Sequence, residues 1–354
     1  MKFSFLFILA LSFVCVSAQS YKELQIEYQK GEFEYVIAQG VPLCKENHDN
    51  INLKLLVGRA YTDNMQYNQA LEYLNYVDQN AKKKGWRRGW CEIYLGICNF
   101  GIGKYEWSRT YLNSAAETGS TDNIRKFAKE QLSILGFTKK YRDFRLKVSE
   151  EILFHFHPDI SENIDAIDKY IKEKEKTFKT AKEFFNCTVP KKIDLFVWES
   201  DQELQKHFEK NKSGYIKPEL CLVHSNINSL TDPNLALVVS HFVKQAVRKT
   251  AIINYGTAKY LSYSDKNIFE DAKKAVIEKG VSSISIKDIW AVNNTKSELF
   301  NIISAAFVQY LIEKEGKEKF LKLFNNQTLY HAKQVYGDEI NKLISDFEAK
   351  LFTS

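Results

Sequence analysis

The first part of the chain carries apolar residues at helical spacing, arranged in pairs of segments. The stretches "YQKGEFEYVIAQ", "YTDNMQYNQALEYL" and "FGIGKYEWSRTYL" each join one helical pattern to a second through a short turn and an aromatic residue. These aromatic residues are Phe33, Tyr67 and Tyr105, spaced 34 and 38 residues apart. A repeat of this length predicts a row of stacked helical hairpins over residues 19–141. The segment "NIRKFAKEQLSIL" predicts the closing helix.

The pattern changes near Arg142, and residues 142–354 predict a second domain. In "EEILFHFHPD" the apolar residues alternate with His155 and His157, as in a strand with one buried face. "KIDLFVW" and "ELCLVHSNI" predict two further strands. A long amphipathic helix precedes the second strand, with apolar residues at helical spacing: Ile164, Ile167, Ile171, Phe178, Ala181 and Phe185.

The rest of this second domain is expected to be mostly helical. "DQELQKHF" predicts a short helix that opens at Asp201, and "DPNLALVVSHFVKQAVRKT" predicts a longer one with Pro233 in its first turn. The residues from Ile268 to Phe352 continue as helices. The sequence therefore predicts a mainly α protein with an α+β second domain.

The first 20 residues, "MKFSFLFILALSFVCVSAQS", have the pattern of a secretory signal peptide. One cation, Lys2, precedes an apolar stretch that ends at the small residues Ser17 and Ala18. The stretch is shorter than the roughly 20 residues that span a bilayer. We expect residues 1–18 to be removed and the mature protein to be periplasmic or secreted, with no integral membrane span after cleavage.

Charge and cysteine content narrow the function classes. The formal net charge is +6, and Lys2 is the only charged residue among the first 18, so the remaining chain carries +5. An excess this small over so long a chain argues against nucleic acid as a partner. Five cysteines remain, an odd number without a CxxC motif, which predicts buried free thiols.

Small residues recur at matching positions of two hairpins in the first domain. "LLVGRAYTDNMQYNQALEYL" places Gly58 where one helix of a hairpin approaches the other, and Ala70 where the second helix crosses. "IYLGICNFGIGKYEWSRTYLNSAA" repeats this with Gly96, the turn residue Gly103 and Ala115. These segments resemble tetratricopeptide repeats. That resemblance implies a helical-hairpin array that binds extended peptides or another domain along its inner face.

The residues expected on that inner face are a cation and four apolar side chains. They are Arg59, Trp90, Ile93, Ile97 and Phe100. An apolar groove beside a cation suits the docking of an apolar polypeptide segment. The same residues would also suit packing against the second domain, and the sequence leaves both interpretations open.

The second domain resembles the thermolysin-like, or gluzincin, metallopeptidases, often called peptidase MA-like. The resemblance covers residues 148–325 and lies in the order of its segments. "SEEILFHFHPD" is similar to the opening strand of that family, and "KIDLFVWESDQEL" to its second strand and helix. "LALVVSHFVKQAV" falls where the active-site helix belongs, "NYGTAKYLS" where the third metal ligand belongs, and "LFNIISAAFVQYLIEKEGKEKFLKLF" at a late pair of helices.

The resemblance does not extend to the catalytic residues. An active site of this family has HExxH on one helix, with two histidines on zinc and a glutamate that activates water. Here that register begins with His241, but Phe242 and Gln245 replace the glutamate and the second histidine. Tyr255 occupies the position expected for the third ligand. We therefore expect no catalytic residues, no metal and no cofactor.

Two other readings remain. A rearranged zinc site would use His224 with His241, or His155 with His157, and would make the protein a metallopeptidase of non-standard geometry. A hydrolase of another mechanism lacks support, because there is no GxSxG motif. The favoured expectation is a non-catalytic scaffold, a pseudopeptidase, that recognises a polypeptide partner. Besides the array, it would use "ELCLVHSNI" as an edge strand, where Leu222 and His224 flank the bound peptide.

Overall fold

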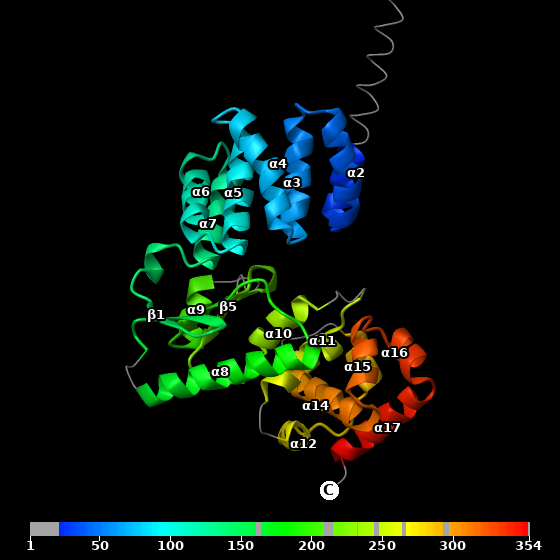
Figure 1. Ribbon diagram of the computed structural model, residues 1–354. Coiled ribbons are helices and arrows are strands. Elements are labelled where there is room, and N and C mark those ends of the chain that lie inside the picture. The colour runs from blue at the N-terminus through cyan, green and yellow to red at the C-terminus, as the bar shows by residue number, and fades with distance from the viewer. Residues whose placement is uncertain are drawn as a thin grey trace, which may run out of the picture. The chain divides into compact units, whose positions relative to one another are not determined.

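The computed structural model describes residues 21–160, 164–208, 215–231, 233–243, 248–263, 267–292 and 297–352. The expected signal peptide, residues 1–18, lies outside this described part. The chain divides into two compact units, Met1–Arg142 and Asp143–Ser354, and each is described here by itself (Figure 1). Most of the described residues are helical, and the second unit adds a small mixed sheet. This confirms a mainly α protein with an α+β second part.

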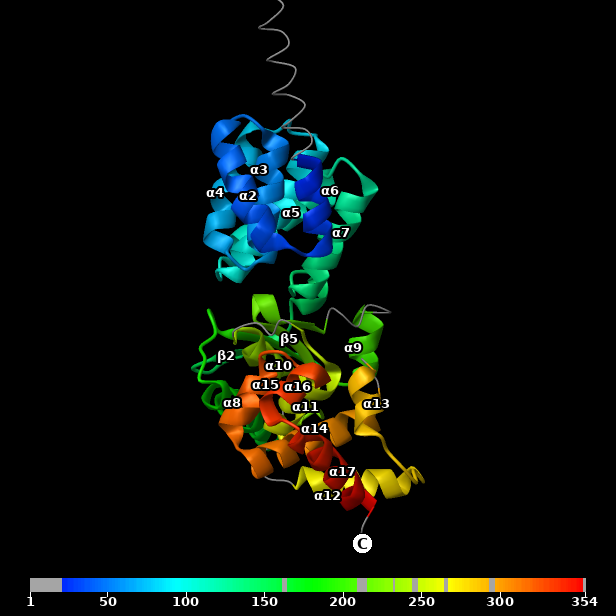
Figure 2. The ribbon, with the colours of Figure 1, turned by 90° about the vertical axis from the view of Figure 1, so that its right-hand side faces the viewer.

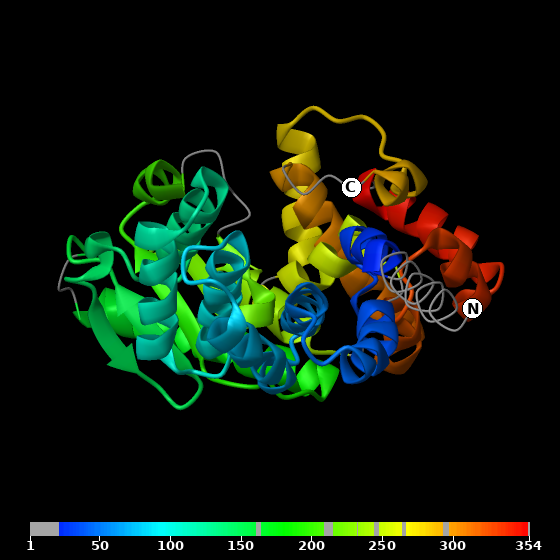
Figure 3. The ribbon, with the colours of Figure 1, turned by 90° about the horizontal axis from the view of Figure 1, so that it is seen from above.

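The first unit is a succession of helices that pack on their neighbours in chain order (Figure 3). Residues 21–30 are helical. The helices that follow are α2 (Phe33–Glu46), α3 (Ile51–Asp63), α4 (Tyr67–Asn80), α5 (Trp86–Gly101), α6 (Tyr105–Thr118) and α7 (Asp122–Ile134). The three aromatic residues that mark the repeat, Phe33, Tyr67 and Tyr105, are the first residues of α2, α4 and α6. The expected helical hairpins and closing helix are confirmed.

Glycines set how closely the helices of two hairpins approach. A β-carbon on Gly58 would lie 2.9 Å from the side chain of Leu74, and one on Gly96 would lie 2.6 Å from that of Leu112. Both distances are shorter than ordinary van der Waals contact, so each glycine allows the two helices of its hairpin to touch. Gly103, in the turn between α5 and α6, has φ +77°, a left-handed conformation that favours glycine.

The second unit contains a five-stranded sheet of order β1-β2-β3-β5-β4. Strands β2, β3 and β5 are parallel, whereas β1 and β4 are antiparallel to their neighbours. The strands are β1 (Arg145–Val148), β2 (Ile152–Phe156), β3 (Ile193–Trp198), β4 (Ile216–Lys217) and β5 (Leu222–Asn226). The three parallel strands were expected from their apolar patterns. The short β1 and β4 were not, because neither carries an apolar alternation long enough to recognise.

Helices form the rest of the unit (Figures 1 and 2). They are α8 (Ile164–Phe185), α9 (Asp201–Phe208), α10 (Asn234–His241), α11 (Ala251–Ser262), α12 (Ile268–Glu278), α13 (Ile286–Ala291), α14 (Glu298–Glu315), α15 (Lys317–Phe324), α16 (Leu329–Tyr336) and α17 (Glu339–Phe352). Helices α8 and α10 pack on one face of the sheet, and α9 packs on the other. The long α8 and the α14–α15 pair match the expectation. No helix in the described part of the chain is long and apolar enough to cross a membrane.

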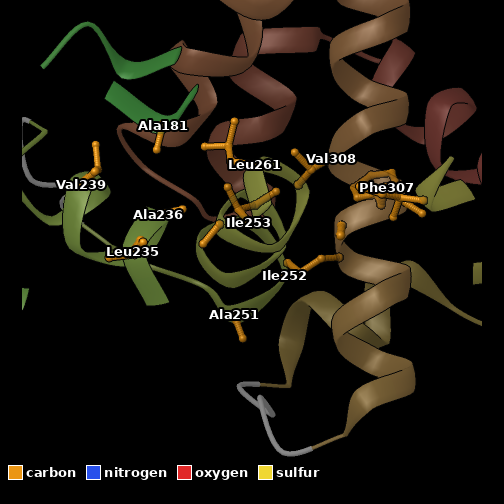
Figure 4. Packing of buried hydrophobic residues seen from close by; sticks show 14 of the residues in the cluster. Ala181, Leu235, Ala236, Val239, Ala251, Ile252, Ile253, Leu261, Phe307 and Val308 are labelled. Carbon is orange, nitrogen blue, oxygen red and sulfur yellow. The ribbon is translucent and has the colours of Figure 1, made fainter. Parts of the chain in front are cut away.

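The core of the second unit gathers around α11. Its residues Ile252 and Ile253 are buried, as are Phe307 and Val308 of α14, and α10 contributes Leu235 to the same cluster (Figure 4). Close packing of α11 on α14 thus places the expected active-site helix, α10, against a rigid apolar interior.

Candidate functional site

The helix that the resemblance placed at the active-site position ends earlier than predicted. The sequence pattern predicted a helix over residues 232–250, but α10 ends at His241, and residues 248–250 are not helical. Phe242 follows the helix and packs against the apolar core, with its ring 5.4 Å from that of His241. The prediction was too long because apolar periodicity does not reveal where a helix stops. Gln245 lies outside the described residues.

The surroundings of His241 favour a neutral imidazole. Burial lowers the pKa of His241 to about 4, and the nearby positive charge of Lys249 acts in the same direction. Tyr255, which stands where the resemblance would place a carboxylate ligand, is a half-buried phenol on α11. Within the described ranges, no three His, Cys, Asp or Glu side chains gather closely enough to hold a metal ion. The residues present therefore do not fit the catalytic zinc that the family resemblance implies.

The two histidines of the first rearranged site lie on opposite sides of the sheet. Successive side chains of a strand point to opposite faces. In β5, Val223 belongs to the apolar cluster that includes α10, whereas His224 stacks on Phe196, with ring centroids 4.8 Å apart. His224 thus points away from the helix that ends at His241, and the expectation that these two side chains converge is wrong.

We call the side of the sheet that carries His155, Phe196, Trp198 and His224 the histidine face. Trp198 Nε1 donates to His224 Nδ1 at 3.2 Å. A neutral imidazole that accepts a hydrogen bond at Nδ1 carries its proton on Nε2. The only free lone pair of the His224 ring is therefore already used by Trp198 and is not available to a metal. His155 stacks on the other side of Phe196 at 4.3 Å, and its ring bonds to a carboxylate. His155 and His157 share a face, as expected, but both are committed to other contacts.

The carboxylate that holds His155 belongs to Asp194, which is 3% exposed. His155 Nε2 and Asp194 Oδ1 are 3.1 Å apart, and Lys191 Nζ is 2.7 Å from Asp194 Oδ2. Because a carboxylate only accepts, His155 Nε2 is the donor. Burial alone would raise the pKa of Asp194, but the His155 hydrogen bond and the Lys191 charge outweigh it and lower that pKa. This arrangement fixes the orientation of the His155 imidazole.

Strand β5 is not an edge strand, which corrects the expected peptide site at Leu222 and His224. Both side chains are buried, and β4 pairs with the outer side of β5. The His224 N–H donates to the carbonyl oxygen of Tyr215 at 2.7 Å. The prediction failed because β4 has two residues, too few for any sequence pattern to announce it.

In the first unit, the sequence-predicted cation, Arg59 on α3, lies among aromatic rings from two other helices. The Arg59 guanidinium carbon is 4.7 Å from the ring of Tyr28, 5.0 Å from that of Tyr94 and 5.6 Å from that of Trp90. The hydroxyls of Tyr28 and Tyr94 are 3.0 Å apart. Tyr94 could have been anticipated, because it stands four residues after Trp90 and so shares its side of the helix. Tyr28 carried no comparable signal.

We call the surface formed by Tyr28, Arg59, Trp90 and Ile97, all half-buried, the array face. Ile93 and Phe100 were expected on it and are not: they are 0% and 1% exposed. At 3.6 residues per turn they lie about 60–80° around α5 from Trp90, toward the interior of the array.

Phe100 illustrates this with its neighbours. Its ring contacts those of Tyr105 and Phe137, at 5.2 and 5.8 Å, so it belongs to the core of the first unit.

The five cysteines of the described residues are free thiols. Cys187 is partly buried, and the others are buried: Cys44, Cys91, Cys98 and Cys221. The expectation of unpaired structural thiols is confirmed for these five.

One hollow of the second unit is away from all of these residues. It has a volume of about 480 Å³ and lies between the turn before β2 and the second half of α8. Lys182 Nζ, 2.5 Å from Glu151 Oε1, forms an ion pair at its wall, and Phe178 lines its base. None of the site residues expected from the sequence lines it.

Comparison with known proteins adds no assignment: no protein-family model matches the chain, and no curated protein matches it.

Proposed function

We propose that this chain is an exported, non-catalytic polypeptide-binding protein, built from a tetratricopeptide-like array and a degenerate gluzincin domain. The observation that carries the proposal is the array face. One guanidinium, that of Arg59 on α3, lies against the ring of Tyr28 from helical residues 21–30 and the rings of Trp90 and Tyr94 from α5, so the first helices of three successive hairpins contribute to this surface. A preformed aromatic and cationic surface of this kind suits contact with a polypeptide.

The array face offers apolar contact area around a largely covered guanidinium. Trp90 and Ile97 keep part of their apolar surface exposed, while the Arg59 Nε is buried without a hydrogen-bond partner. None of the ion pairs within the described residues involves Arg59. Apolar side chains of a bound segment would cover Trp90 and Ile97.

The non-catalytic part of the proposal is supported by the expected active-site region. Phe242 packs into the core where a water-activating glutamate would be needed, and a phenyl ring cannot take up a proton. The order strand, long helix, strand, short helix, strand and apolar helix supports the gluzincin assignment through β2, α8, β3, α9, β5 and α10. The early end of α10 and the inner position of β5 are departures from that plan.

Export is part of the proposal and has its own test. The leader predicts that the mature chain begins near Gln19. Amino-terminal sequencing or intact-mass measurement of the protein outside the cytoplasm should find this terminus. A protein that retains residues 1–18 there would contradict the proposal.

Binding by the array face is tested with matched tryptophan variants. A partner is first captured from exported material, identified, and then measured by titration against the purified protein. Trp90→Ala and Arg59→Gln should each weaken binding by about tenfold or more, as expected for residues central to an interface. Trp107→Ala is the control, because Trp107 lies on α6 and is 60% exposed. Equal affinities for wild type, Trp90→Ala and Arg59→Gln would refute the array face.

A further inference from the structure

Strand β1 forms an open edge of the sheet, and its backbone directions follow from the hydrogen bonds of the turn. The Ser149 N–H donates to the carbonyl oxygen of Ile152 at 2.9 Å, so these residues form a hydrogen-bonded pair. Such pairs alternate with non-hydrogen-bonded ones along an antiparallel ladder. The register pairs Val148 with Leu153 and Leu146 with His155. Leu146 and Val148 are therefore non-hydrogen-bonded toward β2 and direct their N–H and C=O groups outward.

A second hydrogen bond supports the same assignment from the other side of β2. The N–H of His157, the residue directly after β2, donates to the carbonyl oxygen of Val197 at 2.8 Å. The backbone groups of odd-numbered residues along β2 thus form hydrogen bonds with β3. The backbone groups of even-numbered residues point the other way, toward β1. No backbone hydrogen bond within the described ranges engages the outward groups of Leu146 or Val148.

The side chains of the same two residues are unusually exposed for apolar residues. Leu146 is 56% exposed and Val148 is 59% exposed. They are two positions apart and so project from one face of the strand, the histidine face, beside His155. Charged residues such as Arg145 and Lys147 are common on protected edge strands, but they alternate here with two apolar residues. Here the residues with free backbone groups are apolar.

We propose that β1 binds an extended segment of another polypeptide by strand addition, with apolar side chains beside Leu146 and Val148 and an acidic side chain opposite Lys147. This adds a second surface to the proposed polypeptide-binding function. It is independent of the array face, so the two can fail separately. The added strand would continue the sheet at β1 (Figure 1) and bond to the four outward groups of Leu146 and Val148.

The charges on the opposite side of β1 select the occupant. Arg145 and Lys147 alternate with the apolar residues, and Lys147 is only weakly engaged by Asp168, at 3.5 Å between two half-exposed side chains. Because Leu146 and Val148 carry the outward groups, a second copy would pair about a twofold axis at residue 146, 147 or 148. An axis at residue 146 places Arg145 of one copy opposite Lys147 of the other. An axis at residue 147 places Lys147 opposite Lys147 of the other copy.

Like charges directly opposite each other destabilise a strand pair. An axis at Val148 avoids this, but it aligns Leu146 with Glu150, which lies in the turn beyond the strand. Self-pairing is therefore disfavoured in each register. A strand that alternates apolar and acidic residues would place its apolar side chains beside Leu146 and Val148 and its carboxylates beside Arg145 and Lys147.

The test uses two short, capped, fluorescently labelled peptides, one alternating valine with glutamate and one alternating valine with lysine. Fluorescence anisotropy with the full chain should show tighter binding of the glutamate peptide. Val148→Pro should weaken it by about tenfold or more, because proline removes an outward donor and leaves the β1–β2 hydrogen bonds intact. Val148→Thr, which keeps the N–H and the branched shape, is the matched control and should bind within about threefold of wild type.

Two further measurements guard against a misfolded variant. N-methylation of alternate amides along one edge of the glutamate peptide should abolish binding to the unaltered protein, while the same modification on the other edge should not. Lys147→Glu should reverse the preference in favour of the lysine peptide. The proposal is overturned if neither peptide binds, if Val148→Pro binds as wild type does, or if sedimentation reveals a dimer that Val148→Pro dissolves, which would identify a second copy as the occupant.

Discussion

Gly256 of α11 lies so close to α14 that a β-carbon on it would stand 2.7 Å from the carbonyl oxygen of Ser304. That contact involves backbone, which cannot rotate aside as a side chain can. The crossing of α11 and α14 is thus fixed at a single glycine, in the helix next to the expected active-site region.

Gly256→Ala is expected to destabilise the second unit by about 1–3 kcal/mol, since the two helices must separate to admit the methyl group. Urea unfolding followed by far-UV circular dichroism measures the change. Gly58→Ala provides a comparison, because its added β-carbon would meet the side chain of Leu74, which can move. A Gly256→Ala protein as stable as wild type would show that the crossing tolerates a β-carbon.

Acid should destabilise the protein through His241. Its pKa is lowered to about 4 in the folded state by burial and by Lys249, whereas an unfolded histidine titrates near 6.5. The unfolded state therefore binds more protons between these values, and stability falls as the pH drops from about 6.5 toward 4. With a discount for partial solvent exposure, the loss at pH 4.5 is about 1–2 kcal/mol.

His241→Gln should remove this dependence, because glutamine stays neutral throughout. Chemical unfolding of both proteins at a series of pH values from 7 to about 4.5 makes the comparison. The two stability curves should converge in acid or cross. Parallel curves would mean that His241 titrates in the folded protein as it does in the unfolded chain.

Asp194→Asn is expected to cost about 2–4 kcal/mol at neutral pH, because it leaves the charge of Lys191 buried beside a neutral amide. The folded-state pKa of Asp194 is lowered, so its stabilising effect is complete above its ordinary pKa of about 3.8 and is lost as the pH falls below that value. Asp159→Asn is the matched control, since Asp159 also lies beside a histidine but its side chain is 71% exposed. Thermal unfolding should shift for the first variant only; equal shifts would argue against a special role for the buried carboxylate.

The purified protein is expected to contain no stoichiometric zinc and to leave casein and peptide libraries uncleaved. Phe242 and Tyr255 cannot replace a general base and a carboxylate ligand. Elemental analysis of protein prepared without chelators tests the first statement, and a fluorescent casein assay tests the second. One zinc per chain that disappears in His241→Ala would show that the site has been misread.

The sequence by itself determined the elements that follow a local period. Phe33, Tyr67 and Tyr105 marked the helix starts, and the alternation around Phe154 marked β2, because burial of one side of a helix or strand imposes its spacing on the residues within it. The absence of an HExxH motif could also be established from the sequence, since residue identity alone decides whether a side chain can bind zinc or accept a proton.

Only the tertiary structure decided which surfaces remain open. Phe100 and Ile97 belong to one helix and are equally apolar, yet Phe100 is covered by Tyr105 and Phe137 while Ile97 stays partly exposed. Likewise β4 covers the outer side of β5 with two residues, and the open edge falls instead on Leu146 and Val148. Exposure depends on which distant segments pack against an element, and no pattern within that element records it.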